Sequence, residues 1–71
     1  MSKEMAFTIF CLESYKVHRN LTGKAVAKLF DDYSVFDYIY EFYDVLHTTG
    51  YHYINNDIDI YLKSRGAMIP G

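Results

Sequence analysis

Residues 38–50 read Tyr-Ile-Tyr-Glu-Phe-Tyr-Asp-Val-Leu-His-Thr-Thr-Gly, and four of the first six are aromatic. Apolar side chains recur at intervals of three and four residues from Val35 to Leu46, and alternation at every second residue is not sustained. This spacing predicts a helix over residues 35–47, with Ser34 as its cap and Gly50 as its exit signal. Its predicted core face consists of Val35, Phe36, Ile39, Phe42, Tyr43 and Leu46.

A second helix is predicted over residues 3–18, before the central one. Ser2 is a plausible cap, because its side chain can accept a hydrogen bond from a free backbone N–H of the first turn. Met5, Ile9 and Leu12 recur at helical spacing and are predicted to form the core face. The apolar stripe is wider than one contact requires, so we expect this helix to be covered on two sides.

Two further helices are predicted over residues 23–32 and 52–65. Thr22 is expected to cap the first of them. The second contains isoleucines that also fit a short strand, but Lys63 and Arg65 would complement the dipole at a helix C-terminus. We therefore predict a helix at both positions.

The four predicted helices form a compact all-α domain over residues 1–66, followed by a short tail over residues 67–71. A chain of 71 residues buries only about 60% of the surface that its unfolded form exposes. Because 51% of the residues are hydrophobic, we expect some apolar surface to remain exposed for a partner protein or a homo-oligomer.

The N-terminal residues and the single cysteine indicate in which cellular compartment the protein is expected. Residues 1–4 lack a basic region followed by an apolar run, and no apolar run is long enough to cross a membrane. Cys11 alone cannot form an internal disulfide. We therefore expect a cytoplasmic protein without a membrane segment.

Charge is strongly segregated along the chain. Residues 1–30 contain five Lys or Arg and two Glu, whereas residues 31–62 contain seven acidic residues and no Lys or Arg. An acidic, aromatic second half is a poor match to a phosphate backbone but suits a basic protein surface.

Several short motifs follow one another along nearly the whole chain: Phe10-Cys11-Leu12-Glu13, Tyr15-Lys16, Leu21-Thr22-Gly23-Lys24, Leu29-Phe30, Tyr33, Val35, Tyr38-Ile39, Leu46-His47-Thr48-Thr49-Gly50, Tyr53-Ile54 and Asp57-Ile58-Asp59. In this order and spacing they resemble a family of short bacterial proteins of unknown function, domain-of-unknown-function family 3791. The Asn55-Asn56 pair departs from the family pattern, which predicts a weakened start to the last helix. The resemblance implies an accessory or antitoxin-like role beside neighbouring genes, some of which encode ADP-ribosyltransferase-like proteins.

His47, Thr48 and Thr49 are the strongest candidate for chemistry. As a structural device, His47 would end one helix and a threonine would cap the next. As a site in a small enzyme or ligand-binding protein, His47 would act as a general base beside the threonine hydroxyls. Asp57 or Glu13 would then have to orient its ring.

A metal or other cofactor is not expected. Cys11, His18, His47 and His52 are the available soft ligands, and their spacing matches no zinc signature. Cys11 is expected to be a buried core thiol.

The remaining candidate surface is aromatic and acidic. Tyrosine offers a large contact area with a polar handle and is enriched at interfaces. We expect a non-catalytic interaction module that docks another protein, an ADP-ribosyltransferase-like toxin being one candidate, through this face. A helix-turn-helix regulator remains an alternative, although the second helix of that motif would offer acids rather than Arg or Lys to DNA. The predicted contact residues are Tyr38, Tyr40, Glu41, Asp44 and Tyr51.

Overall fold

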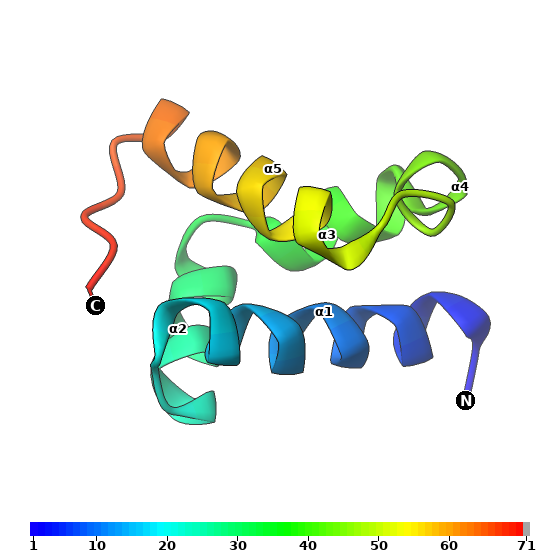
Figure 1. Ribbon diagram of the computed structural model, residues 1–71, viewed down its shortest axis with the longest axis horizontal. Helices are drawn as coiled ribbons and strands as arrows, with labels where there is room; N and C mark the ends of the chain where they lie inside the picture. The colour runs from blue at the N-terminus through cyan, green and yellow to red at the C-terminus, as the bar shows by residue number, and fades with distance from the viewer. Residues whose placement is uncertain (71) are drawn as a thin grey trace.

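A computed structural model describes residues 1–70, which form helices and no strand (Figure 1). The all-α class is therefore confirmed, whereas the predicted number of four helices is not exact. Gly71, the last residue of the predicted tail, lies outside the described residues. The helices are α1 (Lys3–Arg19), α2 (Gly23–Asp32), α3 (Val35–Glu41), α4 (Tyr43–Leu46) and α5 (Tyr51–Ser64).

The N-terminal caps of α1 and α2 are the predicted ones. Ser2 Oγ accepts a hydrogen bond from the backbone N–H of Met5 at 3.0 Å, and Thr22 Oγ1 accepts one from Ala25 at 3.1 Å. Asn20 ends α1 in the left-handed conformation, with φ 54°. The side chains of Ser2 and Thr22 and the backbone N–H of Asn20 therefore pair backbone groups that a helix end would otherwise leave free.

The predicted continuous helix over residues 35–47 is wrong, because the chain breaks at Phe42 into α3 and α4. Phe42 has φ −104° and ψ 22°, outside helical values. Aromatic, β-branched and aspartate residues dominate this stretch, and their intrinsic helix propensity is modest. The helix propensity of these residues is therefore too low to keep the helix continuous through Phe42. The Phe42 ring lies outside the core, beside Tyr38, with ring centroids 5.1 Å apart.

Two further predicted signals at the ends of this region are also wrong. Ser34 does not cap α3 with its side chain; its backbone adopts the left-handed conformation, with φ 58°. Gly50 does not take up the left-handed conformation of a helix exit. It is extended, with φ −60° and ψ 141°, and occupies the N-cap position of α5.

The core face of α1 differs from the predicted one. Thr8, Cys11 and Tyr15 are buried, whereas Met5 and Ile9 are 42% and 45% exposed. The apolar residues of α1 extend almost all round the helix, so the pattern alone does not select a face. Tyr15 donates a hydrogen bond to Asp59 of α5, and this contact favours the observed orientation of α1.

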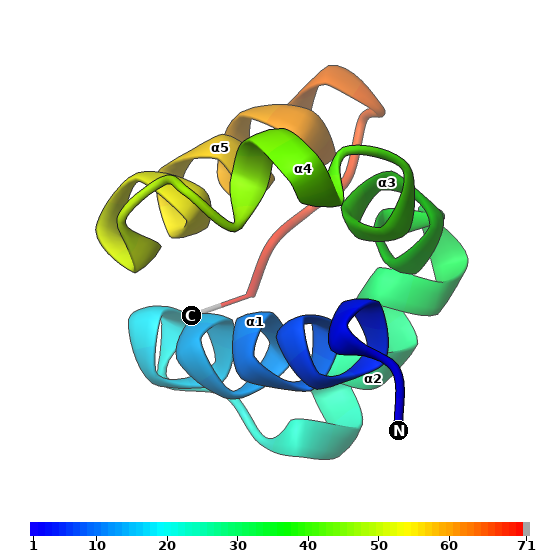
Figure 2. The same cartoon turned by 90° about the vertical axis from the view of Figure 1, so that its right-hand side faces the viewer.

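Helices α1 and α5 run in the same direction and lie one above the other, with α2 at one end and α4 at the other (Figures 1 and 2). After α5 the chain folds back, so that Ala67 and Ile69 pack against the core. No helix within residues 1–70 is both long enough and apolar enough to cross a membrane. The fully buried or nearly buried core side chains are Cys11, Tyr15, Val26, Phe30, Val35, Ile39, Ile54, Ile58 and Leu62.

Candidate functional site

The seam between α1 and α5 pairs residues in a regular register. Residues on α1 at intervals of four contact residues on α5 that also follow one another at intervals of four, one helical turn per step. Such a register requires the two helices to run side by side. The pairs are Phe10 with Tyr51 (ring centroids 6.3 Å apart), Ser14 with Asn55 (3.0 and 3.3 Å) and His18 with Asp59 (2.8 Å).

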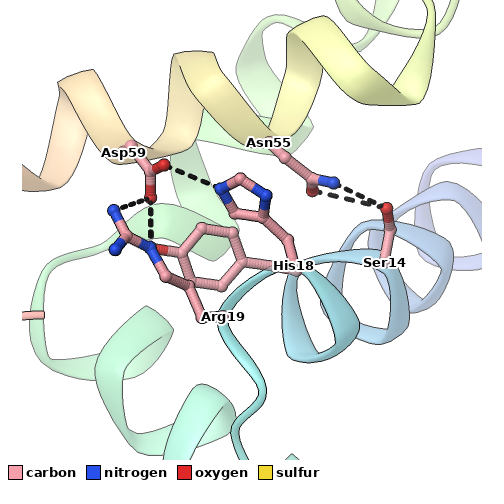
Figure 3. A network of polar contacts seen from close by, with 6 residues as sticks. Ser14, His18, Arg19, Asn55 and Asp59 are labelled. Atoms are coloured by element: carbon pink, nitrogen blue, oxygen red, sulfur yellow. Dashed lines mark hydrogen bonds and ion pairs between the residues drawn. The ribbon is translucent and has the colours of Figure 1, made fainter. Parts of the chain in front are cut away.

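Asp59 collects four contacts at the end of this seam (Figure 3). Its Oδ1 accepts hydrogen bonds from Tyr15 Oη at 2.6 Å and from Arg19 Nε at 3.0 Å, with Arg19 Nη2 at 2.9 Å. Its Oδ2 lies 2.8 Å from His18 Nε2. Every buried side-chain nitrogen and oxygen in residues 1–70 has a partner, so α1 and α5 are joined without an orphaned polar group.

The electrostatics of the cluster stabilise the carboxylate form of Asp59. Burial by itself raises the pKa of Asp59, but hydrogen bonds from Tyr15, His18 and Arg19 outweigh burial and hold it below its ordinary value. Burial, followed by the hydrogen bond to Asp59, raises the pKa of Tyr15. The Asp59 cluster (Tyr15, His18, Arg19 and Asp59) is therefore charged and tightly connected at neutral pH.

The chemistry open to His18 is limited by its neighbours. Its Nε2 atom is occupied by Asp59, and the side chain borders a groove of 480 Å³ between α1 and α5. Ser14, the nearby hydroxyl on the same helix face, exchanges hydrogen bonds with Asn55 instead. The arrangement therefore serves as an interhelical clamp and lacks an activated nucleophile.

The sequence patterns did not predict this cluster, because Asp59 was identified only as part of the Asp57-Ile58-Asp59 motif. A signal was present in the spacing. Ser14 and His18 are four residues apart within an apolar helix, and so are Asn55 and Asp59. Polar residues at that interval share one helix face and can bond across a helix pair.

His47, Thr48 and Thr49 lie together at the exposed end of α4. His47 Nδ1 is 2.8 Å from the carbonyl oxygen of Tyr43, and its ring stacks on that of Tyr43 with centroids 4.5 Å apart. Thr48 and Thr49 donate their hydroxyl hydrogens back to the carbonyl of Val45, at 2.9 and 3.2 Å. The expectation that a threonine caps the next helix is therefore wrong, because both hydroxyls close the preceding turn.

Neither of the carboxylates proposed to orient His47 does so. Asp57 accepts a hydrogen bond from Tyr38 Oη. Glu13 pairs with Lys16 at 2.8 Å. Within residues 1–70, no three His, Cys, Asp or Glu side chains lie close enough together to hold a metal ion.

The predicted tyrosine surface is divided among three grooves. Tyr38 lines a groove between α4 and α5, Tyr40 lines one between α1 and α3, and Tyr51 lines the one between α1 and α5. Residues 38 and 40 are about 200° apart around a helix, so they face opposite sides of α3. Glu41 and Asp44 are exposed on α3 and α4.

Tyr38 is half-buried rather than an exposed edge. Its ring stacks on Tyr61 with centroids 4.5 Å apart. Burial, together with the hydrogen bond to Asp57, raises the pKa of Tyr38 to about 12. Tyr38 therefore contributes a fixed wall to its groove.

The groove between α4 and α5, called here the α4–α5 groove, has a volume of 330 Å³ and a mostly apolar lining. Val45, Tyr53 and Ile60 are 65%, 70% and 59% exposed. Together they form an apolar surface with a polar centre at Asn56 and Asp57. The lining residues are Tyr38, Phe42, Val45, Leu46, Thr49, Tyr53, Ile54, Asn56, Asp57 and Ile60.

Comparison with protein families matches residues 6–65 to a model described as a protein of unknown function, DUF3791. The chain belongs to the DUF3791 family. The match spans α1 to α5, so the Asp59 cluster and the α4–α5 groove both lie within the DUF3791 region. Neither a curated protein nor a solved structure matches the sequence.

Cys11 is expected to resist thiol reagents in the folded protein. Its side chain is fully buried, and burial raises its pKa to about 12, so the reactive thiolate is scarce at pH 8. Labelling with a disulfide reagent at pH 8 should be negligible without denaturant and complete in urea. Rapid labelling of the native protein would contradict the buried position of Cys11.

Proposed function

We propose that this DUF3791 protein is a non-catalytic protein-interaction module that docks its partner in the α4–α5 groove. The observation that carries the proposal is the gathering of Val45, Tyr53 and Ile60, each more than half exposed, along one groove. Large apolar side chains exposed side by side, with polar residues around them, are typical of interaction sites.

The acidic residues of residues 31–62 are the second feature that bears on the choice of partner. Asp32 and Asp59 form ion pairs, whereas the other five acids of residues 31–62 form none within residues 1–70. A partner with complementary positive charge would be favoured. The five are Asp31, Asp37, Glu41, Asp44 and Asp57.

The family resemblance supports an accessory or antitoxin-like role within this proposal. The partner would be the product of a neighbouring gene, an ADP-ribosyltransferase-like toxin being the candidate, and docking would occlude part of its surface. The same acidic residues make duplex DNA a poor partner, because α3 and α4 contain no Lys or Arg to contact phosphates.

The test is a titration of the purified neighbouring gene product with wild-type protein and an Ile60→Asp variant. Burying an aspartate in place of isoleucine removes apolar contact and leaves an unpaired charge, so affinity should fall at least about tenfold, or about 1.4 kcal/mol. Val17→Asp is the matched control. Val17 is 78% exposed on α1, outside the groove. Weakening by Val17→Asp with no effect of Ile60→Asp would move the interface to α1.

A further inference from the structure

We infer that the α4–α5 groove takes an amphipathic helix of the partner, with Lys or Arg placed between and beside its apolar anchors. This inference rests on the proposed function and adds the chemistry of the bound segment. The alternatives, an acidic or extended segment and a second copy of this chain, are separated by the experiment below.

The spacing of the apolar side chains fits a helix. Tyr53 and Ile60 lie seven residues apart on α5, which is two turns or about 10 Å. An amphipathic helix presents anchors at i, i+3 or i+4, and i+7 over the same length. Val45 and Phe42 of the α4 side form the opposite wall.

The centre of the groove carries a carboxylate with spare capacity. Asp57 lies between Tyr53 and Ile60 in sequence and lines the groove with them. It accepts one hydrogen bond, from Tyr38, and forms no ion pair within residues 1–70. Covering this carboxylate with a purely apolar partner would be costly, whereas a Lys or Arg side chain could pair with it.

The charges around the groove have the same sign. Glu41 and Asp44 are exposed on the α3–α4 side, and residues 31–62 contain no Lys or Arg. Like charges across an interface are destabilising, so the surroundings disfavour an acidic segment and speed the association of a basic one. Shape and charge therefore select the same class of partner.

Three synthetic peptides of about 18 residues, or five helical turns, provide the test. The first carries an apolar helical stripe flanked by Lys, the second has the same stripe flanked by Glu, and the third has the composition of the first in an order that destroys the stripe. Binding is measured by fluorescence anisotropy at about 50 mM and about 300 mM salt, where screening differs.

The Lys peptide is expected to bind at least about tenfold more tightly than either of the others, and more weakly at high salt. Ile60→Asp should abolish this binding, and Val17→Asp should not. Asp57→Asn keeps an acceptor for Tyr38, so it should reduce the preference for the Lys peptide over the Glu peptide. Circular dichroism of each variant confirms that the fold is retained.

Equal binding of the Lys and Glu peptides, or of the ordered and disordered Lys peptides, would overturn the inference. Concentration-dependent dimerisation in sedimentation that is lost in Ile60→Asp would assign the groove to a second copy and also overturn it. Failure of all three peptides, with the neighbouring gene product still sensitive to Ile60→Asp, would reject the helix and leave the proposed function standing. Binding of the Lys peptide, with the neighbouring gene product insensitive to Ile60→Asp, would reject the proposed function: the groove would still bind a basic amphipathic helix, but not one from that gene product.

Discussion

Replacing Asp59 with alanine is expected to leave the protein largely unfolded at 25 °C and neutral pH. The substitution removes the acceptor for Tyr15 and His18 and the counter-charge for Arg19. Removing one partner of a fully buried ion pair costs about 3–5 kcal/mol, which is the upper end for this cluster because the Arg19 and His18 side chains are 21% and 31% exposed. A single core of this size rarely supplies more than about 3–5 kcal/mol, so this one loss approaches the whole stability. Far-ultraviolet circular dichroism and thermal melting would show it.

The control for Asp59→Ala is Asp44→Ala, which removes an exposed carboxylate that forms no ion pair within residues 1–70. Its melting temperature should stay within a few degrees of wild type, as surface substitutions usually change stability by less than about 0.5 kcal/mol. A cooperative, wild-type-like melt of Asp59→Ala would show that the cluster contributes little. The pKa of Asp59 is lowered by folding, so its stabilising effect is present above the ordinary carboxyl pKa and is lost as pH falls through the lowered value.

Phe30→Ala is expected to lower the free energy of unfolding by about 3–5 kcal/mol, the range for deleting a buried aromatic ring. Phe30 is fully buried, with its ring centroid 5.4 Å from Tyr15 and 5.6 Å from Phe36. Its loss would leave a cavity between α1, α2 and α3. Urea unfolding followed by circular dichroism measures the change in the midpoint.

Phe42→Ala is the matched control, because Phe42 carries the same ring but is half exposed. Its cost should be well below that of Phe30→Ala, since less apolar surface leaves water on folding. Equal destabilisation by the two substitutions would mean that Phe42 belongs to the core. That result would contradict the position of the break between α3 and α4.

Local signals in the sequence predicted the helix ends well where a side chain determines the geometry. Ser2 and Thr22 act as expected, because the side chain of each satisfies a backbone N–H only three residues away. Ser34 and Thr49 resemble caps equally well in sequence, yet their surroundings give them other conformations or partners. A cap motif is therefore informative only when no competing acceptor lies nearby.

The core face of α1 and the Asp59 cluster could not be predicted from the sequence, because both depend on contacts between helices that are far apart in the chain. Ile9 is as apolar as the buried residues of α1, and its exposure follows from the side of the helix that Tyr15 occupies. The offset of 41 residues between His18 and Asp59 cannot be read from periodicity within either helix. Sequence patterns therefore predict which apolar and polar residues each helix contains, whereas contacts between distant helices determine which helix face is buried.

The break at Phe42 leaves one wall of the α4–α5 groove much less firmly held than the other. Helix α4 is a single turn of four residues with one buried side chain, Leu46, whereas α5 contributes three residues to the core and is joined to α1 through Asp59. Segments with so few buried contacts open locally, and their amide hydrogens exchange without global unfolding. The α4 wall can therefore shift against a fixed α5, which would let bound side chains of different size be accommodated while the core stays closed.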